Sequence, residues 1–235
     1  LMRWPPYDPE KSPKTHTYWY VQSFGLVAER AMFTSEDELT WTPLTDVRKT
    51  GFDFDFTVTL PESGRLSVSV NLPFSVAALE NVCRQYAPWR VPVAETRAGF
   101  DIPAFRFGQG KRVIWLQANV HTIEVSGCHA LVGAMRYLRE HIDEIRDYSF
   151  FIIPSFAVDG LYGDMDKPEQ KKDINRDWGT LTNPENRQVD AFIRGLVADG
   201  YEMLVMTDMH NGWCDPSTSG GNLVEYRDGA AEPQY

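Results

Sequence analysis

The sequence is poor in cysteine, in positive charge and in long apolar runs, and each shortage excludes a class of protein. Its three cysteines, Cys83, Cys128 and Cys214, are too few and too scattered for a disulfide framework or a cysteine-based zinc site. Lys and Arg total 23 against 33 Asp and Glu, so the net charge of −10 leaves no basic stripe for nucleic acid. No apolar run approaches the roughly 18 residues that a membrane helix needs. We therefore expect a soluble protein that binds neither nucleic acid nor a membrane.

The chain also lacks a signal peptide, an internal repeat and a low-complexity segment. It begins at Leu1 and not at a methionine, and it ends abruptly at Tyr235, which predicts a trimmed segment of a longer protein. A missing targeting signal therefore excludes no compartment. The acidic, cysteine-poor composition fits the cytoplasm and a bacterial extracellular or periplasmic space equally.

Residues 1–88 are predicted to form an N-terminal antiparallel β-sandwich domain that ends in a short linker helix. Four stretches carry a strand pattern, the last two with strict apolar–polar alternation: 18–27, 39–44, 52–60 and 66–72. The loop 61–64 (PESG) between the last two predicts a hairpin. Residues 75–86 fit an amphipathic helix, with Ser75 as its N-cap.

Residues 89–235 are predicted to form a second domain of the α/β class. Prolines punctuate a connecting stretch from Pro88 to Pro103. Strands and helices then alternate: strand 113–119, helix 124–140, strand 148–154, helix 184–200 and strand 202–207. This alternation is typical of a mainly parallel or mixed sheet with flanking helices.

Metal-ligating side chains follow two of these strands. His121 and Glu124 come after strand 113–119, and His210 comes after strand 202–207. An α/β sheet binds its ligands just beyond the carboxyl ends of its strands. Two imidazoles and one carboxylate, with one position open, form the ligand set of a catalytic zinc site. In the alternative, structural interpretation, Glu124 only caps a helix beside a partly buried histidine.

A ligating histidine also needs an acceptor on its other ring nitrogen, which fixes the tautomer. Asp173 and Asp208 are both candidates for that role. Cys128 and Cys214 lie near the site in sequence, but no base is paired with either, which argues against a thiol mechanism.

Four short motifs, in this order and spacing, resemble those of the zinc metallocarboxypeptidase family. They are His121–Glu124 (HTIE), Pro154–Gly160 (PSFAVDG), Asp173–Arg176 (DINR) and Asp208–His210 (DMH). The family pattern is His-x-x-Glu, an Asn-Pro-Asp-Gly-like turn, an Asp-x-Asn-Arg loop and a zinc-binding His after a strand. The resemblance spans about residues 110–215. It implies one zinc ion bound by His121, Glu124 and His210.

The same resemblance implies that Asn175 and Arg176 hold the terminal carboxylate of a substrate, and that Asp173 supports the ring of His121. A guanidinium fork is independently suited to bidentate capture of a carboxylate. The N-terminal sandwich, followed by the segment 71–75 (NLPFS), is similar to the cytosolic carboxypeptidase branch. Members of that branch trim glutamates from protein tails or side chains.

The chain departs from the family pattern in two features outside the proposed ligand set. Thr122 and Ile123 replace the usual Pro-Gly or Ala-Arg between the zinc ligands, so the pocket wall is expected to differ. The family also carries an arginine ahead of the Asp-x-Asn-Arg loop, which polarises the scissile carbonyl. Here that loop offers lysines only: Lys167, Lys171 and Lys172.

The general base is the third departure. The family's catalytic Glu lies on a later strand, and a parallel return to the sheet normally needs a crossover of a dozen or more residues. Residues 211–221 show no helix for such a crossover, although Glu225 lies on a strand-like stretch. We therefore expect the base past Tyr235 in a longer parent chain, or absent, with Glu225 as the alternative.

These features predict a zinc-dependent hydrolase that releases a C-terminal or side-chain-linked amino acid from a peptide. Two alternatives stay open. One is an aspartoacylase-like deacylase of N-acyl amino acids, for which an N-terminal sandwich is not expected. The other is a non-catalytic binding protein that keeps the fold and has lost the base.

Overall fold

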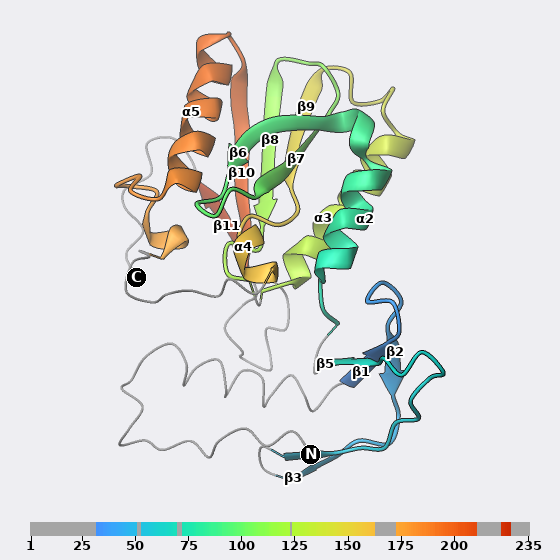
Figure 1. Ribbon diagram of the computed structural model, residues 1–235. Helices are drawn as coiled ribbons and strands as arrows, with labels where there is room; N and C mark the ends of the chain where they lie inside the picture. Colours follow the sequence, from blue (N-terminus) through green and yellow to red (C-terminus); the bar gives the residue numbers. More distant parts are fainter. Residues whose placement is uncertain are drawn as a thin grey trace. The chain divides into compact units, whose positions relative to one another are not determined.

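The computed structural model describes residues 32–50, 53–69, 72–122, 124–162, 173–210 and 222–226 (Figure 1). These residues form two compact units, which divide between Ala78 and Leu79. Among them, no helix has the length and apolar character needed to cross a membrane.

The N-terminal unit contains two small antiparallel sheets. One has the order β2-β1-β5, built from β1 (Met32–Ser35), β2 (Thr42–Leu44) and β5 (Ser67–Ser69). The other pairs β3 (Arg48–Thr50) with β4 (Asp53–Asp55). The antiparallel character predicted for this region is confirmed. The predicted strand 18–27 lies outside the described residues, and the sandwich packing stays a prediction.

The predicted hairpin between strands 52–60 and 66–72 is wrong in its pairing. The turn itself forms, since the Gly64 amide donates to the Pro61 carbonyl at 2.9 Å. However, β4 pairs with β3, whereas β5 pairs with β1. Apolar–polar alternation shows which face of a strand is half-buried, but it does not identify the neighbouring strand.

The linker helix begins as the sequence predicts. It is α2 (Val76–Gln85), and the Ala78 amide donates to Ser75 Oγ at 3.1 Å. A serine hydroxyl that accepts from a first-turn amide satisfies one of the unpaired donors at a helix start. Ser75 is therefore the N-cap.

The C-terminal unit is built on a six-stranded mixed sheet with the order β11-β10-β8-β9-β7-β6. Its strands are β6 (Arg90–Glu95), β7 (Asp101–Phe107), β8 (Arg112–Ala118), β9 (Tyr148–Ile153), β10 (Glu202–His210) and β11 (Asn222–Tyr226). The central strand β8 runs parallel to both β9 and β10, and the outer pairs are antiparallel. The predicted α/β class with a mixed sheet is confirmed.

The prediction that the stretch from Pro88 to Pro103 is only a connection is wrong, because this stretch forms β6 and the start of β7. The two strands pair with a register shift between Val91 and Ala94. Pro92 lies inside that shift, and Pro103 lies opposite it in β7. Proline is tolerated where a ladder is interrupted, at an edge strand or a bulge, since no amide is needed there.

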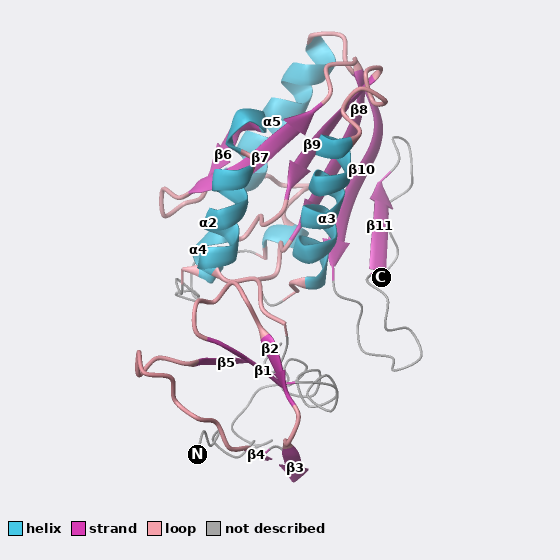
Figure 2. Cartoon of the chain, turned by 90° about the vertical axis from the view of Figure 1, so that its right-hand side faces the viewer, coloured by secondary structure: helices cyan, strands magenta, loops and turns pink. Residues whose placement is uncertain are grey.

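Helices cover both faces of this sheet (Figures 1 and 2). On one face, Phe192 of α5 (Pro184–Ala198) packs on Trp115 of β8 and Phe151 of β9. On the other, α3 (Ser126–Glu140) approaches so closely that a Cβ on Gly127 would collide with Ala118. The sheet is therefore covered by packed side chains on both faces, with an aromatic cluster beneath α5.

Candidate metal centre

The loop after β8 is fixed by one buried asparagine. Asn119 is fully buried and adopts a positive φ of 60°, a left-handed conformation that asparagine tolerates better than most residues. Its Nδ2 donates to the carbonyls of His121 and Thr122, at 3.0 and 2.9 Å. The chain therefore leaves the sheet in a defined turn that carries His121 and then Glu124.

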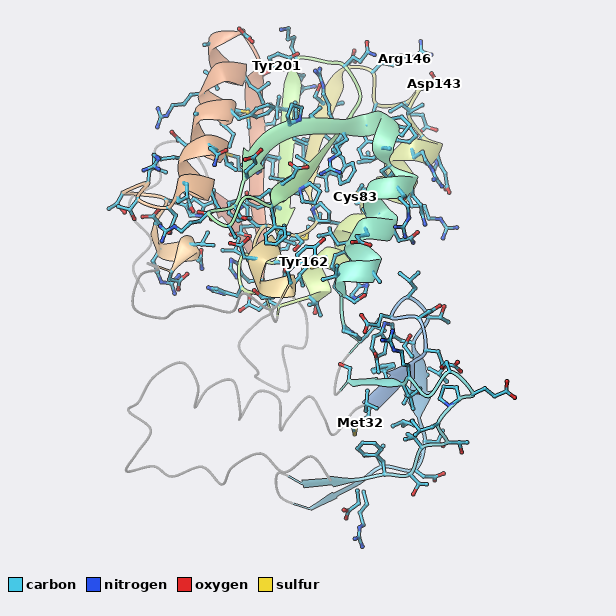
Figure 3. The ribbon with its side chains drawn as sticks, viewed as in Figure 1. Met32, Cys83, Asp143, Arg146, Tyr162 and Tyr201 are labelled. Carbon is cyan, nitrogen blue, oxygen red and sulfur yellow. The ribbon has the colours of Figure 1, made fainter. Side chains whose placement is uncertain are left out.

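Strand β10 brings His210 to the same place. β10 is parallel to β8, and Met209 pairs with Ala118, the last residue of β8. His210, the last residue of β10, therefore lies beside the loop that follows β8. This end of the sheet also carries α4 (Val158–Leu161) and Tyr162, whereas Tyr201 marks the opposite end (Figure 3).

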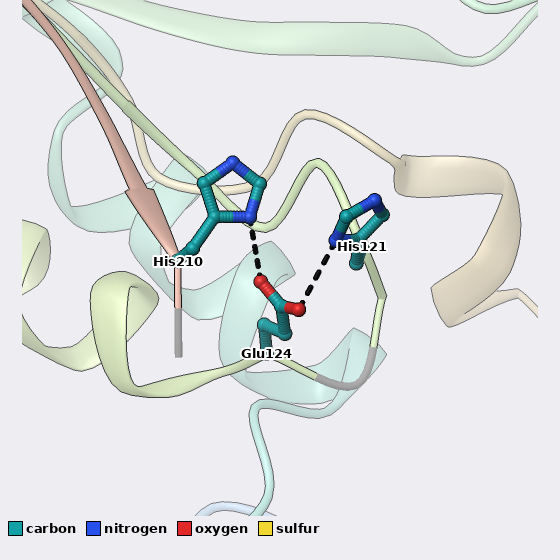
Figure 4. Close-up of side chains that lie close together, drawn as sticks. All are labelled: His121, Glu124 and His210. Atoms are coloured by element: carbon teal, nitrogen blue, oxygen red, sulfur yellow. Dashed lines mark hydrogen bonds and ion pairs between the residues drawn. The ribbon is translucent and has the colours of Figure 1, made fainter. Parts of the chain in front are cut away.

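The three predicted ligands converge (Figure 4). One ligand atom from each of His121, Glu124 and His210 lies within 4.8 Å of the others. Glu124 bridges the two rings: its Oε1 is 3.1 Å from His121 Nδ1, and its Oε2 is 2.7 Å from His210 Nδ1. Among the described residues, these three are the His, Cys, Asp or Glu side chains that lie close enough together, three or more at a time, to hold a metal ion.

A second carboxylate lies behind each imidazole. His121 Nε2 is 3.3 Å from Asp173 Oδ1, and His210 Nε2 is 3.1 Å from Asp208 Oδ2. A carboxylate on the outer nitrogen orients a ligating histidine and increases its basicity. Both rings therefore present Nδ1 to the centre, so the donor set is two nitrogens and a carboxylate.

The same contacts shift the ionisation of the centre. Burial alone would lower the pKa of His121, but its hydrogen bonds to Asp173 and Glu124 outweigh burial and raise the pKa to about 9. For His210, hydrogen bonds to Asp208 and Glu124 likewise outweigh burial and raise the pKa to about 10. Burial would raise the pKa of Glu124, but the two imidazoles lower it to about 2. The metal-free centre is thus a carboxylate between two imidazolium ions.

This donor set fits zinc. Two imidazole nitrogens and one carboxylate oxygen are the protein ligands of many catalytic zinc sites. The site is also reachable, because the side chain of His121 is 24% exposed and that of His210 is 11% exposed. A cation there would replace the two imidazolium protons as the counter-charge of Glu124.

The predicted carboxylate-binding pair lies on the loop that supports His121. Asp173 caps the 3₁₀ turn Ile174–Arg176 by accepting from the Asn175 amide at 2.9 Å. Asn186, buried on α5, donates from Nδ2 to the Ile174 carbonyl at 3.0 Å. Asn175 is half-buried on this turn and Arg176 is exposed. The lysines that this region of the sequence offers in place of the polarising arginine, at 167, 171 and 172, lie outside the described residues.

The structure places the candidate base Glu225 on a strand and the thiol of Cys128 in the core. Glu225 lies in β11, where its backbone pairs with Thr207, and it stays a candidate base. Cys128 is fully buried on α3, and burial raises the pKa of its thiol to about 12. A thiol with such a high pKa is no nucleophile at neutral pH, which agrees with the argument against a thiol mechanism.

A family model described as zinc carboxypeptidase matches residues 90–194, the segment that contains His121, Glu124, Asp173 and Arg176. Over this segment, the chain is similar to the zinc carboxypeptidase family.

Solved structures show the same fold. A metallo-carboxypeptidase from Pseudomonas aeruginosa, in complex with (2-guanidinoethylmercapto)succinic acid, matches 79% of this chain and 52% of its own, with TM-score 0.60 and 16% identity. A metallo-carboxypeptidase from Burkholderia cenocepacia matches 79% of this chain and 53% of its own, with TM-score 0.59 and 19% identity. The chain thus spans about half the length of these relatives. No curated protein matches it significantly.

Proposed function

We propose that this chain forms the zinc-binding part of a carboxypeptidase that releases a C-terminal or side-chain-linked amino acid from a peptide. The observation that supports this most is the convergence of His121, Glu124 and His210. Their backing by Asp173 and Asp208 is typical of a metal centre and costly as a structural ion-pair cluster.

His121, Glu124 and His210 would hold the metal, since the Nδ1 atoms of both rings and the carboxylate of Glu124 face one another. A zinc ion bound there supplies Lewis acidity, which polarises a carbonyl group and lowers the pKa of water. Asp173 and Asp208 keep the proton of each imidazole on Nε2, which leaves both Nδ1 lone pairs free for the metal. Glu225, whose backbone lies in β11, would be the candidate general base in this part of the chain.

Arg176 binds the free carboxylate of the substrate. Its guanidinium can donate two parallel hydrogen bonds to a carboxylate, and Asn175 adds an amide donor on the same turn. Because Asp173 joins this turn to the ring of His121, the carboxylate is bound at a fixed place relative to the metal. That arrangement selects peptides by their terminal carboxylate.

Replacing Arg176 with alanine should weaken binding of a blocked dipeptide to the zinc-loaded chain by roughly 100-fold, because two charge-assisted hydrogen bonds are lost. Calorimetric titration measures this whether or not the chain turns the peptide over. The C-terminal amide of the same dipeptide should bind wild type as weakly as the free acid binds Arg176→Ala. The matched control is Arg194→Ala, an exposed arginine on α5 that pairs with Asp190.

Equal binding of acid and amide by the wild type would contradict the carboxylate anchor. Hydrolysis assays on the same samples separate the remaining alternatives. Cleavage of N-acyl amino acids in preference to dipeptides favours the deacylase, and tight binding without turnover favours a binding protein.

A further inference from the structure

The two loops that follow β8 and β9 are joined into one layer beneath the proposed metal centre. The Phe156 amide donates to the Ala118 carbonyl at 2.9 Å, and the Ala157 amide donates to the Asn119 carbonyl at 3.0 Å. Further along, Gly160 touches Thr122, and a Cβ added to this glycine would collide with the threonine side chain. The loop that carries His121 is therefore packed against a second loop at three points between Ala118 and Thr122.

Asn119 lies in this layer, and both the nitrogen and the oxygen of its side-chain amide form hydrogen bonds. Its Nδ2 donates to the carbonyls of His121 and Thr122, and its Oδ1 accepts from Ser155 Oγ at 2.8 Å. Asn119 and Ser155 are both fully buried. The Ser155 hydroxyl fixes which way the amide faces, so the nitrogen points to the two loop carbonyls.

We infer that Asn119 is a positioning residue, locked by Ser155, which presets the loop so that His121 and Glu124 face His210 before any metal binds. This inference rests on the proposed zinc site and assigns a role to two residues that touch neither metal nor substrate. The turn it holds includes the hydrogen bond from the Glu124 amide to the His121 carbonyl, at 2.9 Å. That bond sets the spacing between the two ligands.

The same strand provides a matched control. Gln117 is also a buried amide side chain, on the strand that leads to the site, but its Oε1 accepts from Trp115 Nε1, within the same strand. Gln117→Ala and Asn119→Gly each remove a buried amide. Glycine at 119 keeps the positive φ available, so the second variant tests the amide and not the backbone conformation.

The experiment measures two quantities in the full chain: hydrogen exchange at the Glu124 amide without metal, and the affinity for zinc. Asn119→Gly should speed exchange by about tenfold or more, because two buried hydrogen bonds that hold the turn are lost. Zinc affinity should fall by about 10–100-fold, the usual cost of losing a group that orients a ligand. Gln117→Ala should change neither quantity. If Asn119→Gly does not fold, Ser155→Ala should show both changes in weaker form.

The inference is overturned if Asn119→Gly exchanges its Glu124 amide at the wild-type rate and binds zinc with the wild-type affinity. If Asn119→Gly does not fold, the same result in Ser155→Ala overturns it. If the wild type itself binds no zinc, the proposed function fails, and the exchange rate in the metal-free protein still decides the role of Asn119.

Discussion

Zinc affinity should rise by about 100-fold for each pH unit between about pH 6 and 8. In the metal-free protein the pKa values of His121 and His210 are raised to about 9 and about 10, so both rings carry a proton in this range. A ligating imidazole must be neutral, and each zinc ion therefore displaces two protons. Histidines with an ordinary pKa of 6.5 would be neutral already, and the affinity would level off near pH 7.

Competition with a chelator of known affinity, repeated across this pH range, measures the slope. Calorimetry in buffers of different ionisation enthalpy measures the released protons directly, and we expect about two per zinc at pH 7. A slope below tenfold per unit, or release of less than one proton, would contradict the ionisation state of the centre.

The same pKa values determine how the stability of the metal-free fold depends on pH. A histidine whose pKa is raised on folding stabilises the fold fully below its unfolded value of 6.5, and loses that contribution as pH rises through its folded value of about 9 to 10. The pKa of Glu124 is lowered from 4.5 to about 2, so its contribution to stability is complete above pH 4.5 and is lost as the pH falls through about 2. The metal-free centre therefore stabilises the fold most between about pH 4.5 and 6.5.

Replacing Glu124 with glutamine should reduce zinc affinity by at least about 100-fold, because the neutral amide removes the only anionic ligand of the three. It should also lower the pKa of both histidines, since the glutamate hydrogen bonds that help to raise them are lost. The pH dependence of zinc binding should then level off at a lower pH than in the wild type. Zinc titrations of the variant measure both effects.

Glu140→Gln is the matched control, because Glu140 is an exposed glutamate at the end of α3 that pairs with Arg136 one helical turn away. It should bind zinc as the wild type does. Circular dichroism and thermal unfolding check that both variants fold. Wild-type affinity in Glu124→Gln would remove this glutamate from the ligand set.

The elements that position the site could be predicted because each carries a strong local pattern. The apolar stretch 113–119 differs from β8 by one residue at each end, and the amphipathic stretch 184–200 contains all of α5. The predicted helix 124–140 begins two residues before α3, since Glu124 is used for the site and not for a helical turn. Local periodicity is enough where one element buries one face.

Sequence reasoning failed where pairing depends on distant partners. The prolines in β6 and β7 conceal two strands, because the register shift that accommodates them exists only in the paired sheet. The pairing of β5 with β1, and not with β4, depends on residues more than 30 positions away. Neither partner leaves a local signal.

The convergence of His121, Glu124 and His210 could be predicted from residue type and from position after a strand, and the structure brings the three side chains together. Their role as metal ligands stays a prediction. Asn119 was not among the predicted site residues. An asparagine directly after a buried strand, two residues before a histidine, is a weak signal. Its role becomes visible only once the positive φ and the hydrogen bonds to His121, Thr122 and Ser155 are known.

Zinc content per purified chain tests the central claim most directly, for wild type, His210→Ala and His129→Ala. His210 lies 86 residues from Glu124 in sequence and 2.7 Å from it in space, whereas His129 is an exposed histidine on α3. We expect about one zinc per chain in the wild type and in His129→Ala, and its loss from His210→Ala during dialysis. No zinc in the wild type after incubation with the metal, or full retention in His210→Ala, would contradict a metal centre built from these three residues.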